Sequence, residues 1–134
     1  MADTLGQGAQ PGAQPVILRK RAECLAAARA RRQATAGFLL QARRREPDEG
    51  AAGIRVGYTC SKKVGNAVTR NRAKRRLREV ARAVLPALGR PGWDYVLVGR
   101  PEATVTRPFA DLLADLTEAM ERIHAPRKPR DPAP

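Results

Sequence analysis

Basic side chains crowd into residues 62–82, which have the sequence KKVGNAVTRNRAKRRLREVAR. The stretch holds nine Lys or Arg residues and one acidic residue, Glu79, in a chain whose formal net charge is +13. Guanidinium groups bind phosphate through paired hydrogen bonds and stack on bases, so the chemistry that this segment offers is the binding of a polyanion. A positive excess of this size favours nucleic acid as the partner.

On a helical wheel, this segment divides into an apolar stripe and two basic surfaces. The stripe is expected to pack on a sheet and consists of Ala73, Leu77, Val80, Ala81 and Val84. The residues expected to contact the polyanion are Lys62, Lys63, Arg70, Asn71, Arg72, Lys74, Arg75, Arg76, Arg78 and Arg82. A merely solvated helix mixes opposite charges four residues apart, whereas Lys74, Arg78 and Arg82 repel one another at that spacing.

Two features at the start of this helix add possible contacts. Backbone N–H groups at a helix start favour phosphate, and Gly65 lies in the turn that leads into it. Asn71 can bond a base edge, a ribose hydroxyl or a backbone group, or it can cap the helix, and both roles remain open.

Candidate catalytic residues are scarce. The only histidine, His124, is expected at the surface beside a loose tail, and we find no paired carboxylates in a basic site and no Ser-His-Asp or Cys-His set. Cys24 and Cys60 lack the spacing of a zinc site or a disulfide framework and are expected to be reduced and partly buried. We therefore expect no catalytic residue, no metal site and no cofactor bound by the protein.

The hydrophobic pattern predicts one α+β domain, a small α/β sandwich with the element order α-β-β-α-β-α. The expected elements are a helix over residues 17–33, a strand over 38–43, a strand over 54–61, the basic helix ending near Leu85 before Pro86, a strand over 94–100 and a helix over 106–124. The domain is expected to span residues 16–123, between disordered tails at residues 1–15 and 124–134.

Three patterns set the expected packing. The first helix should bury Leu18, Leu25 and Ala28, and the strand over residues 54–61 should alternate between two faces. The last helix should have an inner stripe of Phe109, Leu112, Leu113, Leu116, Met120 and Ile123, with Asp111, Asp115, Glu118 and Glu121 facing outward. With neither a secretory signal nor a long apolar run in the sequence, the expected location is the cytoplasm.

The segment SKKVGNAVTRNRAKRRLRE, its upstream extension RVGYTC and the later DYVLVGR resemble the protein subunit of bacterial ribonuclease P. The resemblance covers about residues 18–123. It implies a protein that assists a catalytic RNA in removing the 5′ leader of precursor tRNA, with Mg²⁺ serving the RNA-catalysed reaction. The implied partners are the catalytic RNA and precursor tRNA, with no membrane and no obligate protein partner. It also implies a left-handed β-α-β crossover, where handedness rules alone predict a right-handed one.

The resemblance assigns RNA binding to the arginine-rich motif and a leader cleft to the first helix and the sheet. The motif positions are Arg70, Asn71, Arg72, Lys74, Arg75 and Arg78, and the cleft positions are Cys24, Ala28, Gln41, Thr59 and Ser61. Relatives often carry aromatic residues where this chain has Cys24, Ala28 and Gln41. Leader binding here is therefore expected to depend on charge and hydrogen bonds more than on stacking.

The main alternative is a structural RNA-binding protein, such as a ribosomal protein, which would share the charge and the lack of catalytic groups. A DNA-binding helix would carry more base-reading polar residues and fewer charges. A membrane-surface helix would expose Trp, Phe or Leu, which the basic helix lacks. A protein-only nuclease agrees least with the sequence.

Overall fold

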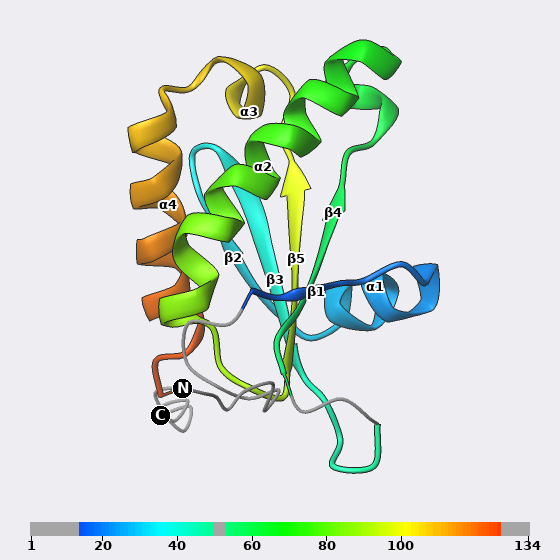
Figure 1. Ribbon diagram of the computed structural model, residues 1–134. Helices are drawn as coiled ribbons and strands as arrows, with labels where there is room; N and C mark the ends of the chain where they lie inside the picture. The colour runs from blue at the N-terminus through cyan, green and yellow to red at the C-terminus, as the bar shows by residue number, and fades with distance from the viewer. Residues whose placement is uncertain (1–13, 50–52, 127–134) are drawn as a thin grey trace, which may run out of the picture.

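The computed structural model describes residues 14–49 and 53–126, and the expected tails lie mostly outside these residues. Ten elements follow one another in the described chain: β1 (Val16–Ile17), α1 (Arg21–Ala28), β2 (Arg31–Ala34), β3 (Phe38–Arg44), β4 (Arg55–Thr59), the 3-10 helix η1 (Lys62–Val64), α2 (Ala67–Leu88), β5 (Trp93–Gly99), α3 (Ala103–Thr106) and α4 (Phe109–Ile123). The strands form one sheet in the order β1-β4-β5-β3-β2. Figure 1 shows α2 and α4 together on one side of this sheet, which confirms the α+β class.

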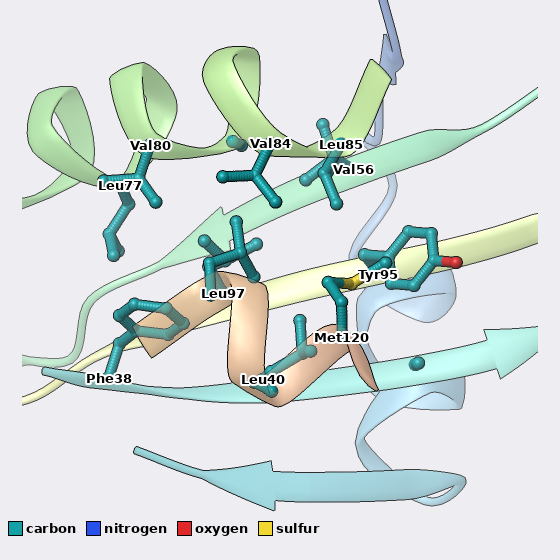
Figure 2. Close-up of a cluster of buried hydrophobic side chains, with 14 of the residues drawn as sticks. Phe38, Leu40, Val56, Leu77, Val80, Val84, Leu85, Tyr95, Leu97 and Met120 are labelled. Carbon is teal, nitrogen blue, oxygen red and sulfur yellow. The ribbon is translucent and has the colours of Figure 1, made fainter. Parts of the chain in front are cut away.

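The main core lies between the sheet and the pair of helices α2 and α4. Alternate residues of β3, β4 and β5 face these helices, and Figure 2 shows Leu77 and Val84 of α2 above Leu97 of the sheet. The core residues include Phe38, Leu40, Val56, Leu77, Val80, Leu85, Tyr95, Leu97, Leu112, Leu116 and Met120. The opposite face carries a smaller cluster of Leu18, Ala27 and Val96 beneath α1. The sheet therefore separates α1 from α2.

The connection from β4 through α2 to β5 is left-handed. β4 and β5 pair in parallel, and in Figure 1 both strands run upward with β4 to the right of β5 while α2 descends in front of them. A path that rises at the back, descends in front and moves leftward has the left-handed sense. The handedness implied by the family resemblance is therefore observed, against the general rule for such crossovers.

The expected first helix is wrong in its extent. Its first residue, Ile17, lies in β1, which pairs with β4, and its residues 31–33 lie in β2, which pairs antiparallel with β3. Only α1 remains helical, and it buries Ala27 rather than Leu25, whose side chain is exposed. Pairing with β4, which is distant in the sequence, and with the hairpin partner β3 overrides the helix propensity of Ala and Arg in these segments.

Proline has opposite effects at two helix boundaries. Helix α2 continues through Pro86, which lies in its last turn, and ends at Leu88. Leu85 in this turn is fully buried, and the carbonyl of Leu85 accepts a hydrogen bond from the N–H of Gly89. The expected helix over residues 106–124 instead begins at Phe109, because Thr106 ends the separate short helix α3 and Pro108 is the N-cap residue of α4. Phe109 then lies at the exposed start of α4 and does not join the inner stripe.

Candidate nucleic-acid interface

Helix α2 turns its basic residues away from the sheet. Its start is capped by Asn66, whose side chain accepts a 2.9 Å hydrogen bond from the N–H of Thr69. The predicted apolar stripe is buried throughout, which fixes the rotation of the helix. Asn71, Arg72, Arg75, Arg78 and Arg82 are consequently exposed, while Arg70, Lys74 and Arg76 are half-buried. Since Asn66 is the cap and Asn71 lies within the helix, a capping role for Asn71 is excluded.

Arg76 contributes to the fold as well as to the charge. Its guanidinium donates a hydrogen bond to the carbonyl of Arg107, at the junction between α3 and α4. Its Nε, like that of Arg70, is buried without a hydrogen-bond partner among the described residues. Arg76 therefore ties α2 to the segment before α4, and its guanidinium is less available to a ligand than those on the exposed ridge.

The turn from β4 into α2 presents Lys62 and Lys63 to solvent. The Ser61 hydroxyl accepts a 3.3 Å hydrogen bond from the N–H of Lys63 and so caps η1. Gly65 has a φ of 146°, and a Cβ there would lie 2.9 Å from the side chain of Thr69, so only glycine suits this position. Strand β4 ends at Thr59, so the expectation that Ser61 belongs to the strand is wrong.

The opposite face of the sheet holds most of the predicted leader cleft. Cys24 packs against the small cluster beneath α1, and Gln41 is buried on β3. Gly57 permits the approach of α1, because a Cβ there would lie 3.1 Å from the Sγ of Cys24. Thr59 is half-buried on the same face as Gly57, and Ala28 is half-buried at the end of α1. The structure thus brings Cys24, Gln41 and Thr59 to one face, beside α1.

Both cysteines are free and half-buried, as expected. Burial is the main cause that raises the pKa of the Cys24 thiol, and the nearby carboxylates of Glu23 and Asp94 raise it further. Burial likewise raises the pKa of Cys60, although Lys74 opposes the shift. Both thiols are therefore neutral at physiological pH and suited to packing rather than to nucleophilic chemistry.

An ion-pair network that the sequence did not reveal docks α1 onto the sheet. Asp94 of β5 is fully buried, and its carboxylate accepts hydrogen bonds from Arg45 at 2.6 Å and from two nitrogens of Arg55 at 2.8 Å. Arg55 also pairs with Glu23 of α1 at 2.9 Å. Arg55 therefore links α1 to β5 through β4. The sequence signal was an acidic residue at the start of an otherwise apolar strand.

The arginines of the described chain differ in whether the fold supplies them with a carboxylate partner. Arg43, Arg45, Arg55, Arg107 and Arg122 each pair with a carboxylate of the protein. Arg72, Arg75, Arg78 and Arg82 make no ion pair among the described residues. The exposed ridge of α2, defined here as these four residues, is thus a concentrated positive surface that the fold itself does not neutralise.

The acidic residues of α4 are kept apart from that ridge or are already paired. Asp111, Glu118 and Glu121 are exposed, but Asp115 is half-buried and pairs with Arg107 at 2.8 Å, so its expected outward orientation is wrong. Within residues 14–49 and 53–126, no three His, Cys, Asp or Glu side chains are placed to hold a metal ion.

His124 is buried, which corrects its expected surface position. Its Nε2 lies 2.7 Å from the Tyr95 hydroxyl, and that hydroxyl accepts a 2.9 Å hydrogen bond from the N–H of Arg90. Nε2 and the hydroxyl share this hydrogen bond inside the core, while Nδ1 is buried without a hydrogen-bond partner among the described residues. Burial, aided by Arg90 and Arg31, lowers the pKa of His124 to about 4. This histidine closes the end of the core and takes no part in the basic surface.

Comparison with known proteins agrees with this geometry. A family model described as Ribonuclease P matches residues 14–124. The chain belongs to the ribonuclease P protein family. It is 65% identical over 111 residues to the ribonuclease P protein component of Ruegeria pomeroyi, which covers 83% of this chain and 88% of the relative. It is 50% identical over 116 residues to that of Paramagnetospirillum magneticum, with 83% and 84% covered.

Solved structures of ribonuclease P proteins share the fold. The protein from Thermotoga maritima superposes with a TM-score of 0.66 at 24% identity, covering 81% of this chain and 97% of that one. The Staphylococcus aureus protein superposes with a TM-score of 0.65 at 21% identity, covering 83% and 97%. Family membership makes the chain the protein component of an endoribonuclease complex and implies partnership with ribonuclease P RNA. Among the described residues, no helix is long and apolar enough to cross a membrane.

Proposed function

We propose that this chain binds ribonuclease P RNA through the exposed ridge of α2 and assists the RNA in cleaving the 5′ leader from precursor tRNA. The observation that carries the proposal is the ridge itself, because four exposed arginines lie on one helix without an acidic partner in the described fold. The phosphates of the RNA backbone supply the negative charge that these arginines lack within the described fold. Family membership does not favour the alternative of a ribosomal protein.

The hydrolytic chemistry is proposed to belong to the RNA. The histidine is buried, the thiols are neutral and Asp115 is paired, so the exposed ridge of α2 offers guanidinium groups that bind phosphate. A metal ion that activates water in such a system is held by the RNA and its substrate, so Mg²⁺ enters as a cofactor of the RNA. The protein contributes by binding, orienting and neutralising charge, and its proposed location is the cytoplasm.

The face beneath α1 is proposed to take the precursor's leader. Cys24, Gln41 and Thr59 share this face, and Lys62 and Lys63 follow at the end of β4, where phosphates can be bound. None of the five proposed cleft residues is aromatic. The leader is therefore expected to be held by its backbone and by polar groups, with weak dependence on base identity.

Reconstitution tests the proposal. The full chain, freed of RNA, is mixed with ribonuclease P RNA at low Mg²⁺, and 5′ maturation of a precursor tRNA is measured with and without the protein. We expect the protein to stimulate cleavage by the RNA and to cut nothing alone. Arg75→Ala should weaken stimulation, whereas the matched control Arg122→Ala, an exposed arginine paired on α4, should not. Cleavage by the RNA-free protein, or equal effects of the two variants, would contradict the proposal.

A further inference from the structure

A pocket of about 400 Å³ opens at the β1 edge of the sheet, on the same face as α2. Ile17 pairs with Val56 across β1 and β4, and Tyr58 lies two residues further along the same face of β4. Helix α2 covers the middle of the sheet but leaves this edge open, so Ile17 keeps 39% of its surface exposed. The pocket is lined by Gln14, Pro15, Ile17, Val56, Tyr58 and Arg82.

The pocket combines an aromatic side chain with two cations. The guanidinium of Arg78 lies 5.7 Å from the centre of the Tyr58 ring, within the range of a cation–π contact. Arg82, one helical turn further, borders the pocket directly. Burial raises the pKa of Tyr58 to about 12 although both arginines oppose the shift, so the phenol stays neutral. The site is apolar and aromatic on one side and positive on the other.

These properties complement a nucleotide, in which a planar aromatic base is attached to a phosphate. We propose that the pocket binds one unpaired nucleotide of ribonuclease P RNA, with its base against Pro15, Ile17 and Tyr58 and its phosphate at Arg82 and Arg78. The proposal rests on the proposed function, since it takes the RNA already held by the α2 ridge as its ligand. A volume of about 400 Å³ lies within the usual range for small-ligand pockets.

The position of the pocket along α2 supports an RNA ligand over a free metabolite. Arg75, Arg78 and Arg82 follow one another at helical spacing on the exposed ridge, so the phosphates of one strand can pass from the middle of the helix to the pocket. The ring of Tyr58 is placed where this row of cations ends. Phe38 and Tyr95 are fully buried, Trp93 contacts Arg31 and Phe109 lies at the start of α4, whereas the ring of Tyr58 contacts an arginine of the ridge itself.

Substitutions at Tyr58 test the base contact by the affinity of the full chain for ribonuclease P RNA. Tyr58→Phe keeps the ring and should bind as the unmodified chain does. Tyr58→Leu removes the ring but keeps an apolar side chain, and we expect affinity to fall about tenfold, as is typical for the loss of one stacked base. Because Tyr58 also packs against the core, the thermal midpoint of each variant is measured alongside.

A second variant leaves the core untouched. Ile17→Trp places a large side chain from the exposed edge strand into the pocket and should weaken RNA binding to a similar extent. Leu88→Trp, at an exposed apolar residue at the end of α2 that does not line the pocket, is the matched control and should not. If Ile17→Trp binds RNA with unchanged affinity, the inference is wrong and another group, such as a segment of this chain or a protein partner, fills the pocket. If the unmodified chain fails to bind the RNA, the proposed function itself is wrong.

Discussion

Replacement of Asp94 by Asn changes few atoms but should lower the stability of the fold strongly. The Asp94 side chain is fully buried, and its two oxygens accept hydrogen bonds from both Arg45 and Arg55 at 2.6–2.8 Å. Asparagine keeps the shape but removes the charge and turns an N–H₂ group toward one guanidinium. Arg45 and Arg55, both largely buried, then lose the carboxylate that they share, while Glu23 still pairs with Arg55.

The size of the effect follows from burial. The side chains of Arg45 and Arg55 are only 3% and 16% exposed, so water cannot replace the lost carboxylate. Breaking a buried ion pair from one side costs about 3–5 kcal/mol in the free energy of unfolding. For a domain of this size, each kcal/mol corresponds to roughly 4 °C, so the thermal midpoint should fall by roughly 10–20 °C.

Circular dichroism melts at neutral pH measure this shift, with Glu49→Gln as the control. Glu49 pairs with Arg43 at 2.8 Å at the surface, where solvent screens the pair, and its replacement should leave the midpoint nearly unchanged. A thiol-labelling assay adds a local readout. Because Arg55 ties Glu23 of α1 to Asp94, the variant should expose Cys24 to labelling faster than Cys60. A midpoint within a few degrees of the unmodified chain would refute the account of this network.

Three further outcomes follow from the structure. Leu77→Ala, at a fully buried position of α2, should lower the free energy of unfolding by about 2–5 kcal/mol. Arg72→Ala should change the free energy of unfolding by less than about 0.5 kcal/mol but weaken RNA binding. Urea titrations measure the stability of the two variants, and filter binding measures their affinity for RNA. The pKa of His124 is lowered to about 4 in the folded chain, so the imidazole of the unfolded chain takes up a proton at a higher pH. The free energy of unfolding should therefore fall as the pH drops from about 6.5 to 4. His124→Gln should reduce this dependence of stability on pH in urea titrations. RNA affinity should decrease steeply with salt, with a logarithmic slope of roughly −4 to −5 if about six phosphates are contacted, and a flat slope would exclude the α2 ridge as the main contact.

Long periodic elements could be predicted from the sequence. The apolar stripe of α2 recurs over several turns, and each of its five members is buried in the structure. The alternation in β4 was equally clear, because Val56 faces the main core while Gly57 faces α1. In both cases the period alone determines which side chains face inward, so no knowledge of distant segments was needed.

Short edge strands could not be predicted in the same way. Strand β1 has two residues and β2 has four, and all of them except Val16 and Ala34 fall within the single Ala- and Arg-rich helix expected over residues 17–33. Strand β1 depends on hydrogen bonds to β4, which is distant in the sequence, and β2 depends on its hairpin partner β3, which follows after residues 35–37. The intrinsic propensity of a residue does not depend on its pairing partner, and a strand of so few residues shows too little periodicity to be predicted.

The same limit applied to the individual roles of the arginines. In the sequence, Arg55 and Arg75 are equivalent contributors to a high positive charge. In the fold, Arg55 is held by Asp94 and Glu23, residues from two other elements, while Arg75 has no acidic partner among the described residues. Long-range pairing thus removes one set of arginines from the surface charge and leaves the other available. The net charge of +13 therefore does not show which arginines are exposed without a carboxylate partner, as the four of the α2 ridge are among the described residues. Binding strength on this surface depends on which arginines the fold leaves unpaired, more than on how many the chain contains.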